Sequence, residues 1–530
     1  MSAWVPPRYA HHVPPRPGGV EQARVAIVGG GLVGLTAALD LARRGIASVL
    51  LDEDDTLSTG SRAICFSQRT LEIMGRLGIG QRFLDKGITW NRGRVFFRDR
   101  EAYSFDLLPE SGHEYPAFVN LQQYYAEQWL IEACEASGLV DLRWGSRVTG
   151  VVPRADGAAL EVETRSGPYR LDAEWVLACD GVHSKVRRAL DLPFTGQVFD
   201  DRFLIADVRM QADFPSERWF WFDPPFHPGQ SVLLHKQPDD LWRIDFQLGR
   251  DADPEAEREP ERVRARVAAM LGEGVAFDLD WVSVYTFRCR RLERFRHGRV
   301  LFLGDAAHQV SPFGARGGNG GVQDADNLCW KLAIVLQGEA PERLLDSYDA
   351  ERIPAADENI RHSSRATDFI TPKGSACRAY RDAVLELARD LPLARPFVNS
   401  GRLSQPAVLR DSPLNGPDEA PRAAPPGTAC PDAPILRDGQ PDWLLRQFGQ
   451  GFLLLAREAH PVKMEGLRTV ELRDSPRPGA LHDHSGLAAA RLGLAPGECA
   501  LVRPDQHIAA RFATTAPDPI LAALRRARSL

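Results

Sequence analysis

The chain has 530 residues, of which 44% are apolar and 26% are charged, and its formal net charge at pH 7 is −6. This length allows two or three domains with a sizeable core, and a negative charge without any basic run argues against a nucleic-acid partner. No apolar run reaches the length of a membrane span, so we expect no membrane partner.

The cysteines and the N-terminal residues indicate the cellular compartment of the protein. The eight cysteines are scattered and form no C-x-x-C pair, which favours reduced thiols in a cytoplasmic protein over a disulfide framework or a zinc site. No metal site is therefore expected. Residues 1–19 are rich in proline but lack the apolar segment of a secretory signal. We interpret residues 1–22 as a flexible arm whose His11 and His12 are solvated.

Residues 24–54 have the pattern of a strand, a glycine turn, a helix and a second strand. Gly29, Gly31 and Gly34 form G-x-G-x-x-G after the first strand, and Asp52 ends the second strand. In this context the glycines predict a dinucleotide site, with pyrophosphate at the helix N-terminus and ribose hydroxyls on the Asp carboxylate. A βαβ unit with incidental glycines would not combine all these parts.

Two polar residues follow that could contact such a nucleotide. Arg62 begins the loop before an expected helix, and Gln123 lies near the start of the helix expected over 120–136. A guanidinium could contact a phosphate or lie over a flat ring, and an amide could hydrogen-bond a cofactor. The alternatives are a surface arginine and an ordinary amide on the helix surface.

The segment over 139–190 suggests a β-meander and then a second nucleotide-facing turn. A hairpin turn is expected at 155–157, and Asp180 begins an Asp-Gly turn after a strand. Such a turn is unremarkable by itself. Here it follows a nucleotide site and precedes a helix rich in cations, and this arrangement suits phosphates.

Residues 88–107 and 194–287 alternate in the manner of strands and are rich in aromatic side chains. Most of these rings are expected in the core, and a subset that faces a cavity would suit an apolar, aromatic substrate. The sequence does not identify a catalytic base. Candidates from the presumed substrate region are Tyr103, His113, His235 and Tyr285, although a structural role is the simpler interpretation of each.

Residues 300–333 form a second glycine-rich signature. An apolar strand ends at Gly304–Asp305, and a loop with five glycines leads into a helix that starts near Gly320. Glycines let backbone N–H groups approach a flat ring or a phosphate closely. A glycine-rich lid of some other α/β enzyme is the alternative when this segment is considered alone.

Helices are expected over 344–366 and 375–394, and residues 412–434 are rich in proline and glycine, as in a linker. Residues 443–530 contain further strands and helices, which predicts a small α/β domain. These elements are expected over 451–456, 468–472, 487–494 and 500–502.

The glycine fingerprint, the Asp-Gly turn and the second glycine loop, in this order, resemble those of the class A FAD-dependent aromatic monooxygenases, the para-hydroxybenzoate hydroxylase superfamily. The resemblance covers about residues 24–366 and is strongest to 3-(3-hydroxyphenyl)propionate hydroxylases and polyketide hydroxylases. The tail is less similar, but residues 501–511 resemble the thioredoxin-like C-terminal domain of the longer members.

The resemblance implies FAD as cofactor, NADPH or NADH as co-substrate, and O2. It implies cofactor-binding roles for matching positions: pyrophosphate and adenosine ribose at the first fingerprint, FAD or NAD(P)H at the Asp-Gly turn, and the ribityl chain and flavin ring at the second loop. These positions are Gly29, Gly31, Gly34, Asp52, Arg62, Gln123, Asp180, Gly304, Asp305, Pro312, Gly314, Gly317, Gly318 and Asn319.

The implied reaction is hydroxylation of a phenolic ring through a flavin C4a-hydroperoxide. The alternatives are a polyketide-type hydroxylase, a phenol monooxygenase that removes a nitro or halogen substituent, a flavin dehydrogenase or a Baeyer–Villiger-type oxygenase. A flavin-binding protein without oxygenase activity is an alternative from another class. The W-x-W-x-I-P motif of flavin halogenases is absent.

The implied fold is α/β: a Rossmann-type FAD-binding domain interleaved with an antiparallel-sheet substrate domain, plus a thioredoxin-like C-terminal domain. We hypothesise that the C-terminal domain serves dimerisation, which would make the protein a homodimer. The expected organisation is an arm (1–22), a discontinuous FAD-binding domain (23–80, 120–193 and 288–366), a substrate domain (81–119 and 194–287), a helical segment (367–405), a linker (406–434) and the C-terminal domain (435–530).

Overall fold

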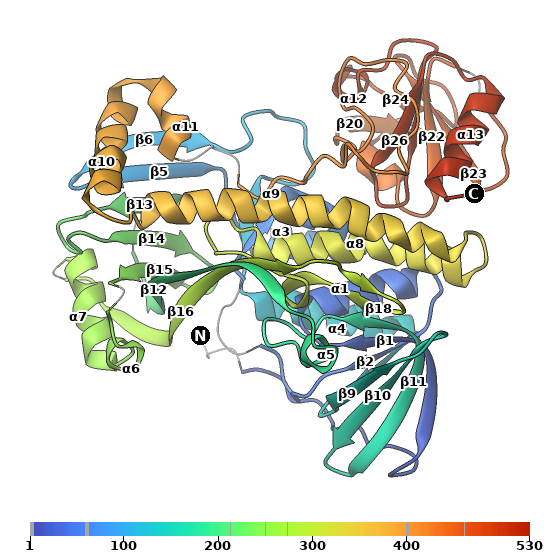
Figure 1. Cartoon of the computed structure of the whole chain (residues 1–530). Coiled ribbons are helices and arrows are strands. Elements are labelled where there is room, and N and C mark those ends of the chain that lie inside the picture. The colour runs from blue at the N-terminus through green and yellow to red at the C-terminus, as the bar shows by residue number, and fades with distance from the viewer. Residues whose placement is uncertain are drawn as a thin grey trace.

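The computed structural model describes residues 5–58, 63–212, 214–249, 251–272, 274–398, 403–459 and 462–530. Three large sheets organise this part of the chain (Figure 1). One belongs to the nucleotide-type unit, one is covered by α6 (Pro254–Glu257) and α7 (Pro260–Leu271), and one forms a separate body near the C-terminus. The mixed α/β fold with several sheets that the sequence predicts is confirmed.

The first sheet has a parallel centre. The strands of that centre lie in the order β18 (Val300–Phe302), β11 (Gly167–Ala178), β1 (Val20–Val28), β2 (Ser48–Leu51), β8 (Val140–Arg143). β17 (Arg296–His297), β9 (Arg147–Pro153) and β10 (Ala158–Thr164) join antiparallel. Val25, Ala26 and Ile27 are fully buried, because central parallel strands are covered on both faces.

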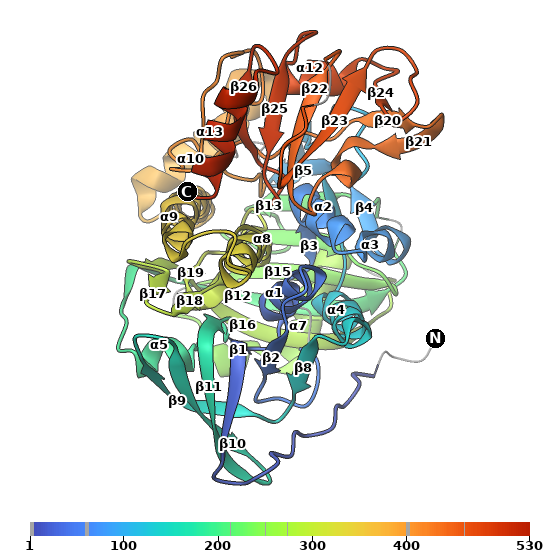
Figure 2. The ribbon, with the colours of Figure 1, turned by 90° about the vertical axis from the view of Figure 1, so that its right-hand side faces the viewer.

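Three helices pack together over this parallel centre. They are α1 (Leu32–Arg43), α4 (Gln123–Ser137) and α8 (Gly317–Leu336), and α1 contacts both of the others. Figure 2 shows α1 lying between α4 and α8. This arrangement brings the N-termini of α1 and α8, which follow the two glycine signatures, to the same carboxyl edge of the sheet.

The second sheet is the one that the alternating, aromatic-rich segments predict. Its order is β19 (His308–Gln309), β16 (Phe277–Leu292), β12 (Phe194–Met210), β15 (Leu241–Leu248), β14 (Ser231–Lys236), β13 (Arg218–Phe222), β5 (Arg92–Phe97), β6 (Arg100–Asp106). The expectation of a purely antiparallel sheet is wrong at one place, since β13 and β5 are parallel. Their long connection runs through the nucleotide-type unit, and only antiparallel neighbours can be joined by a tight hairpin.

Smaller elements complete this region. A three-stranded sheet of β3 (Cys65–Ser67), β7 (Phe118–Asn120) and β4 (Ile88–Trp90) leads into α2 (Gln68–Arg76) and α3 (Gly80–Lys86). The outer face of the second sheet packs apolar side chains against α7 (Pro260–Leu271), which α6 (Pro254–Glu257) precedes. The long helix α9 (Asp346–Ile370) runs across both units, and α10 (Ser375–Asp390) contacts β6 (Figure 1).

The third sheet forms the C-terminal body. Its order is β21 (Gln440–Trp443), β20 (Pro434–Arg437), β24 (Leu481–His482), β23 (Leu467–Arg473), β22 (Phe452–Arg457), β25 (Cys499–Val502), β26 (Ile508–Phe512), with α12 (Leu487–Leu492) and α13 (Pro517–Ala527). The segment predicted as a linker is hydrogen-bonded to this sheet. Gly416 N–H donates to Ala509 O at 2.7 Å, and Cys430 N–H donates to Gln506 O at 2.7 Å.

The N-terminal arm, predicted to be flexible, makes specific contacts over its described part. The Tyr9 ring stacks on Trp144 with centroids 4.6 Å apart, and His12 N–H donates to Trp144 O at 2.8 Å. His11, predicted to be solvated, lies 3.1 Å from a carboxylate oxygen of Asp55. Among the described residues, no helix combines the length and apolar character that crossing a membrane requires.

Candidate functional site

The first glycine turn contains glycines of two kinds. Gly29 has φ +106°, and a Cβ there would lie 2.4 Å from the carbonyl oxygen of Cys179; one at Gly34 would lie 2.0 Å from Gly29 O. These two are required by backbone packing. Gly31 differs, because its Cβ would meet only Glu127 Oε1, at 3.7 Å, and α1 begins there without a side-chain cap. The first N–H groups of α1 are therefore open to a ligand.

Asp52 lies at the end of β2, beside this turn. Its Oδ2 accepts a hydrogen bond from Gly30 N–H at 2.5 Å, and its Oδ1 accepts one from Asp54 N–H at 2.8 Å. Burial raises the pKa of the carboxyl to about 6. The structure therefore brings the predicted ribose acceptor and the predicted pyrophosphate turn into direct contact.

The Gln123 amide is hydrogen-bonded to protein groups in the structure. Its Oε1 accepts a hydrogen bond from Ala63 N–H at 2.9 Å, and its Nε2 donates to Glu127 Oε1 at 2.7 Å. Glu127 also accepts from the Ser58 N–H and hydroxyl. The amide thus holds the ends of the loop that contains Arg62, which itself lies outside the described residues.

Asp180 caps a short helix with one of its carboxylate oxygens. Its Oδ2 accepts hydrogen bonds from Lys185 N–H at 2.7 Å and Val186 N–H at 3.0 Å, in the first turn of α5 (Lys185–Ala189). Burial raises the pKa of this carboxyl. The Lys185 ammonium, expected to suit phosphates, pairs with Glu53.

The Gly304–Asp305 turn is fixed from behind by a buried carboxylate that the sequence did not reveal. Gly304 N–H donates to Asp324 Oδ2 at 3.0 Å, and the same carboxylate lies 2.6 Å from His308 Nε2 and 2.7 Å from Arg352 Nε. Although burial opposes ionisation, His308 and Arg352 hold the pKa of Asp324 below its usual range. The side chain of Asp305 is exposed at the front of the turn.

The second glycine loop ends where α8 begins. Pro312 is exposed and Gly314 has φ +100°, a conformation that favours glycine. α8 begins at Gly317 without a side-chain cap. A Cβ at Gly317 would lie 3.7 Å from Cγ2 of Val310, and a Cβ at Gly318 would lie 3.3 Å from Cβ of Ala63. Packing within the protein does not require glycine at Gly317, whereas a Cβ at Gly318 would be tight against the Cβ of Ala63.

Asn319 has its whole amide group engaged. Its Nδ2 donates to Cys65 O at 2.8 Å and Ala315 O at 2.6 Å, and its Oδ1 accepts from Ser67 N–H at 3.0 Å and Thr70 Oγ at 2.6 Å. The side chain therefore joins the glycine loop to β3 and α2. Only its backbone remains for the predicted contact with a cofactor.

The four candidate bases lie in different places. Tyr103 is buried, and its hydroxyl has no hydrogen-bond partner among the described residues. Burial raises its pKa, which disfavours a phenolate. His113 lies beside Arg491 of the C-terminal body, and Tyr285 on β16 is 36% exposed. His235 is buried 3.9 Å from Cys65 Sγ, and burial holds its pKa well below its usual range, so it is neutral.

The inner face of the second sheet carries polar residues that the sequence analysis missed. Along β15, the apolar outward side chains alternate with Arg243, Asp245 and Gln247, all buried on the inner face. Strict alternation in LWRIDFQL is a signal that could have shown one polar face. Aromatic rings flank it, with Phe203, Phe287 and Phe313 packed at centroid distances of 4.8 to 5.4 Å.

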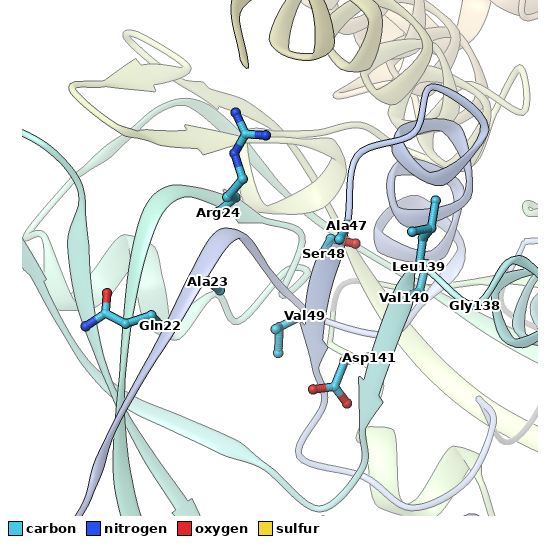
Figure 3. A pocket seen from close by; sticks show the side chains of 10 residues that line it. All are labelled: Gln22, Ala23, Arg24, Ala47, Ser48, Val49, Gly138, Leu139, Val140 and Asp141. Carbon is cyan, nitrogen blue, oxygen red and sulfur yellow. The ribbon is translucent and has the colours of Figure 1, made fainter. Parts of the chain in front are cut away.

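A surface depression of about 400 Å³ lies at the opposite edge of the first sheet. Figure 3 shows its lining residues on the early parts of β1, β2 and β8, among them Arg24, Ser48 and Asp141. The glycine turn follows the carboxyl end of β1. This depression is therefore separate from the nucleotide-facing edge.

The comparisons with known proteins match this geometry. A family model described as an FAD binding domain matches residues 22–363. The chain belongs to this family. A 6-methylpretetramide 4-monooxygenase from Streptomyces rimosus is 32% identical over 528 residues, which cover 94% of this chain and 92% of that protein.

Other relatives agree. A 3-(3-hydroxy-phenyl)propionate/3-hydroxycinnamic acid hydroxylase from Mycolicibacterium smegmatis is 27% identical, over 85% of this chain and 79% of that protein. The fold is shared with the flavin-dependent monooxygenase PieE, solved with FAD and substrate, at a TM-score of 0.82 and 21% identity over 95% and 99% of the two chains. The resemblance stated from the sequence is confirmed: this FAD-binding-domain protein is a flavoprotein monooxygenase whose cofactor is FAD.

Proposed function

We propose that this monooxygenase hydroxylates a polycyclic phenol of the polyketide type, using NAD(P)H and O2. The observation that carries this proposal is the match along nearly the whole chain to a protein whose name gives 6-methylpretetramide as its substrate. The buried inner face of the second sheet supports it, because rings such as Phe203 and Phe313 lie beside a set of polar side chains. A ligand with fused rings and several oxygens matches that mixture.

The open helix N-termini fit FAD. At the predicted glycines Gly31 and Gly317, no described protein atom comes closer than 3.7 Å to an added Cβ, and a closely approaching ligand explains why a side chain is missing there. We assign the pyrophosphate to the first turn of α1, the ribose hydroxyls to Asp52, and the flavin ring to the start of α8. Bound FAD supplies hydride acceptance from NAD(P)H and activation of O2.

The protein's own groups contribute position and electrostatics. Uncapped N–H groups at the start of α8 stabilise negative charge placed against them. Asp324 fixes the Gly304–Asp305 turn, and Asn319 fixes the loop that enters α8. The packed rings of Phe203, Phe287 and Phe313 exclude water from the adjacent space, which protects a reactive oxygen-transfer step from side reactions.

We further propose the domain organisation expected from the sequence, with a thioredoxin-like architecture for residues 435–530. Parallel pairing of β22 with β23 and antiparallel pairing of β25 with both β22 and β26 support this architecture. Cys430 lies just before this domain, and Cys499 is buried within it. Burial raises the pKa of both thiols. Dithiol chemistry is therefore no part of the proposal.

The test is anaerobic reduction of the purified yellow protein by NADPH and by NADH, with and without a panel of mono- and polycyclic phenols. The proposal expects one polycyclic phenol to accelerate flavin bleaching by orders of magnitude. The same phenol should then gain one labelled oxygen atom under ¹⁸O2. Bleaching that no phenol accelerates, or reduced O2 that leaves only as hydrogen peroxide with every phenol, would refute the hydroxylase assignment.

A further inference from the structure

Four charged or ionisable side chains lie in one row across the inner face of the second sheet. In the register of the antiparallel strands, His235 is opposite Arg243, and Arg243 is opposite Asp207. Trp219 pairs with Leu234, so the preceding residue, Arg218, lies level with His235. The row therefore runs Arg218, His235, Arg243, Asp207 from β13 to β12, and all four side chains are buried.

The charges of this row are not all balanced. Arg243 donates to Asp207 from Nε at 2.9 Å and from Nη2 at 3.0 Å, which makes a complete ion pair. Arg218 is only 9% exposed, yet within the described ranges it forms no hydrogen bond or ion pair, and its Nε is buried without a partner. A buried guanidinium without an anion is costly to the fold. An arginine in this position suits a ligand that brings the anion.

A second unsatisfied group lies one step along the same face. Asp245 follows Arg243 by two residues on β15 and is 8% exposed. Its buried Oδ1 has no hydrogen-bond partner in the described part of the chain. Burial raises its pKa to about 6, although the nearby Arg243 and Arg218 act in the opposite direction. Arg218 and Asp245 do not pair with each other in the described structure. The face thus offers a cationic donor and a separate carboxylate acceptor.

This row is connected to the glycine loop by two contacts. His235 Nδ1 lies 3.9 Å from Cys65 Sγ, and the carbonyl oxygen of Cys65 accepts the Asn319 amide at 2.8 Å in the first turn of α8. Ala315 of the loop packs in the same apolar cluster as Cys65 and Trp90, whose ring centroid is 6.1 Å from that of His235. The Arg218 end of the row is therefore adjacent to the place assigned to the flavin ring.

We propose that Arg218 is a substrate-binding residue that pairs with an ionised oxygen of the substrate, while Asp245 accepts a hydrogen bond from a neutral hydroxyl of the same molecule. Arginine is suited to this task because its planar donors bind carboxylates and related oxyanions in a bidentate manner. The substrate is therefore an anion at neutral pH, as a carboxylate or as the enolate of an acidic 1,3-diketone. This inference rests on the proposed function, since it identifies the chemical class of the substrate at that site.

Equilibrium binding to the oxidised holoenzyme tests the inference without turnover, through the change in flavin absorbance. The carboxylate probe is 3-(3-hydroxyphenyl)propionate, compared with its neutral amide. The enolate probe is a naphthol that carries a 1,3-diketone, compared with its methyl enol ether. We expect at least one anion to bind tenfold or more tightly than its neutral counterpart, and the pair that shows the preference identifies the oxyanion.

The variants are Arg218→Gln, Arg218→Lys and the control Arg209→Gln, which removes an arginine paired with Asp280 on the same sheet. We expect R218Q to lose the tenfold preference, R218K to keep part of it, and R209Q to keep all of it. We also expect Arg218→Met to raise the Tm of the substrate-free holoenzyme, because it removes an uncompensated buried charge. An unchanged preference in R218Q, or a lower Tm in R218M, would overturn the inference.

Failure of this inference differs from failure of the proposed function. If phenols accelerate flavin reduction and are hydroxylated but show no preference for the anion, only the role of Arg218 is wrong. If no phenol binds or accelerates reduction in the FAD-loaded wild type, the hydroxylase assignment is wrong and the inference fails with it. The FAD content of each purified variant shows that the comparison is made on folded enzyme.

Discussion

Arg503 of the C-terminal body and Glu351 of α9 form a fully buried, bidentate ion pair, with Nη1 2.5 Å from Oε1 and Nη2 3.0 Å from Oε2. Glu351 also accepts from the Lys331 ammonium of α8 at 2.6 Å. Although burial opposes ionisation, Arg503 and Lys331 hold the pKa of Glu351 well below its usual range. The C-terminal body is thereby joined to α9 and α8.

Removing one partner of this pair should destabilise the enzyme strongly. Arg503→Met leaves the Glu351 carboxylate buried with less compensation, and such losses cost about 3–5 kcal/mol. The control Arg92→Gln breaks an exposed pair with Asp106, which is worth about 0–1 kcal/mol. Urea unfolding followed by fluorescence measures both. Equal effects of the two substitutions would show that the buried pair does not join the domains energetically.

A chain that ends at Pro406 should not yield a soluble flavoprotein. The truncation removes Arg503, the partner of Glu351. It also removes two acceptors of the buried Arg69 guanidinium, which are the main-chain oxygen of Asp505 at 2.8 Å and the side-chain oxygen of Gln506 at 2.9 Å. It also exposes Trp330, which packs on Phe452 with centroids 5.6 Å apart. Soluble yield and FAD content of the truncated chain measure this. A soluble, yellow, monomeric product would support the dimerisation hypothesis for the C-terminal domain instead.

Alanine at two glycines should separate folding from cofactor binding. Gly317→Ala adds a methyl group with no protein atom closer than 3.7 Å, so the fold should persist while FAD binds at least tenfold more weakly. Gly29→Ala forces a Cβ to within 2.4 Å of a backbone oxygen at φ +106°, so it should abolish soluble expression. Circular dichroism and FAD titration of the apoprotein measure these effects. Full FAD affinity in G317A would exclude the start of α8 from the flavin site.

The sequence predicts the nucleotide-type unit well because its signals are local. The strand, the glycine turn, the helix and Asp52 follow one another in the sequence. The residue types of each show the backbone conformation that it adopts. The same holds for the turn at residues 155–157, where Arg154 N–H donates to Gly157 O at 2.8 Å. Where the segments that form one hydrogen-bonded unit are adjacent in the sequence, their residue types are enough to predict the unit.

The roles of single polar side chains depend on neighbours that are distant in sequence. Gln123 and Asn319 hold protein backbone with their amides, through partners such as Ala63 and Cys65 that their own residue types do not reveal. The row from Arg218 to Asp207 exists only through the register of four strands. Nor does composition show that the proline-rich segment after residue 406 packs on the C-terminal sheet, since proline and glycine are common in free linkers and in ordered surface loops alike.

The Asn319 amide should be necessary for retention of FAD. Asn319→Ala leaves the carbonyl oxygens of Cys65 and Ala315 and the N–H of Ser67 without their side-chain partner. Each buried group left unsatisfied costs about 1–3 kcal/mol, and the loop that it anchors leads into α8. We expect FAD affinity to fall by roughly 10- to 100-fold, at 1.4 kcal/mol per tenfold. Gel filtration with flavin absorbance measures it.

Asn319→Asp is the matched comparison for that loss. It keeps the acceptor oxygen for Ser67 and Thr70 but replaces the two N–H donors by a carboxylate oxygen facing two carbonyls. We expect N319D to retain FAD no better than N319A. Retention at the wild-type level in either variant would mean that the loop is positioned without this amide.

FAD affinity should depend on pH through Asp52. Its pKa in the folded apoprotein is raised by burial from 3.8 to about 6, so the carboxyl is ionised above that pH and mostly protonated at pH 5. Each Asp52 oxygen already accepts one backbone N–H, and only the ionised carboxylate keeps a further lone pair on both oxygens for ribose hydroxyl protons. Between pH 8 and pH 5, affinity should therefore fall by roughly tenfold, at one pH unit below the pKa.

The same pKa determines how Asp52 affects the stability of the apoprotein. Between pH 3.8 and about 6 the carboxyl is protonated only in the folded chain, so its contribution to stability is fully present below that window and is lost as the pH rises through it. Asp52→Asn should make FAD affinity nearly independent of pH over pH 5–8. Asp54→Asn, at an exposed neighbour, should keep the wild-type slope. An identical slope in D52N, measured by FAD titration, would assign the pH dependence to another group.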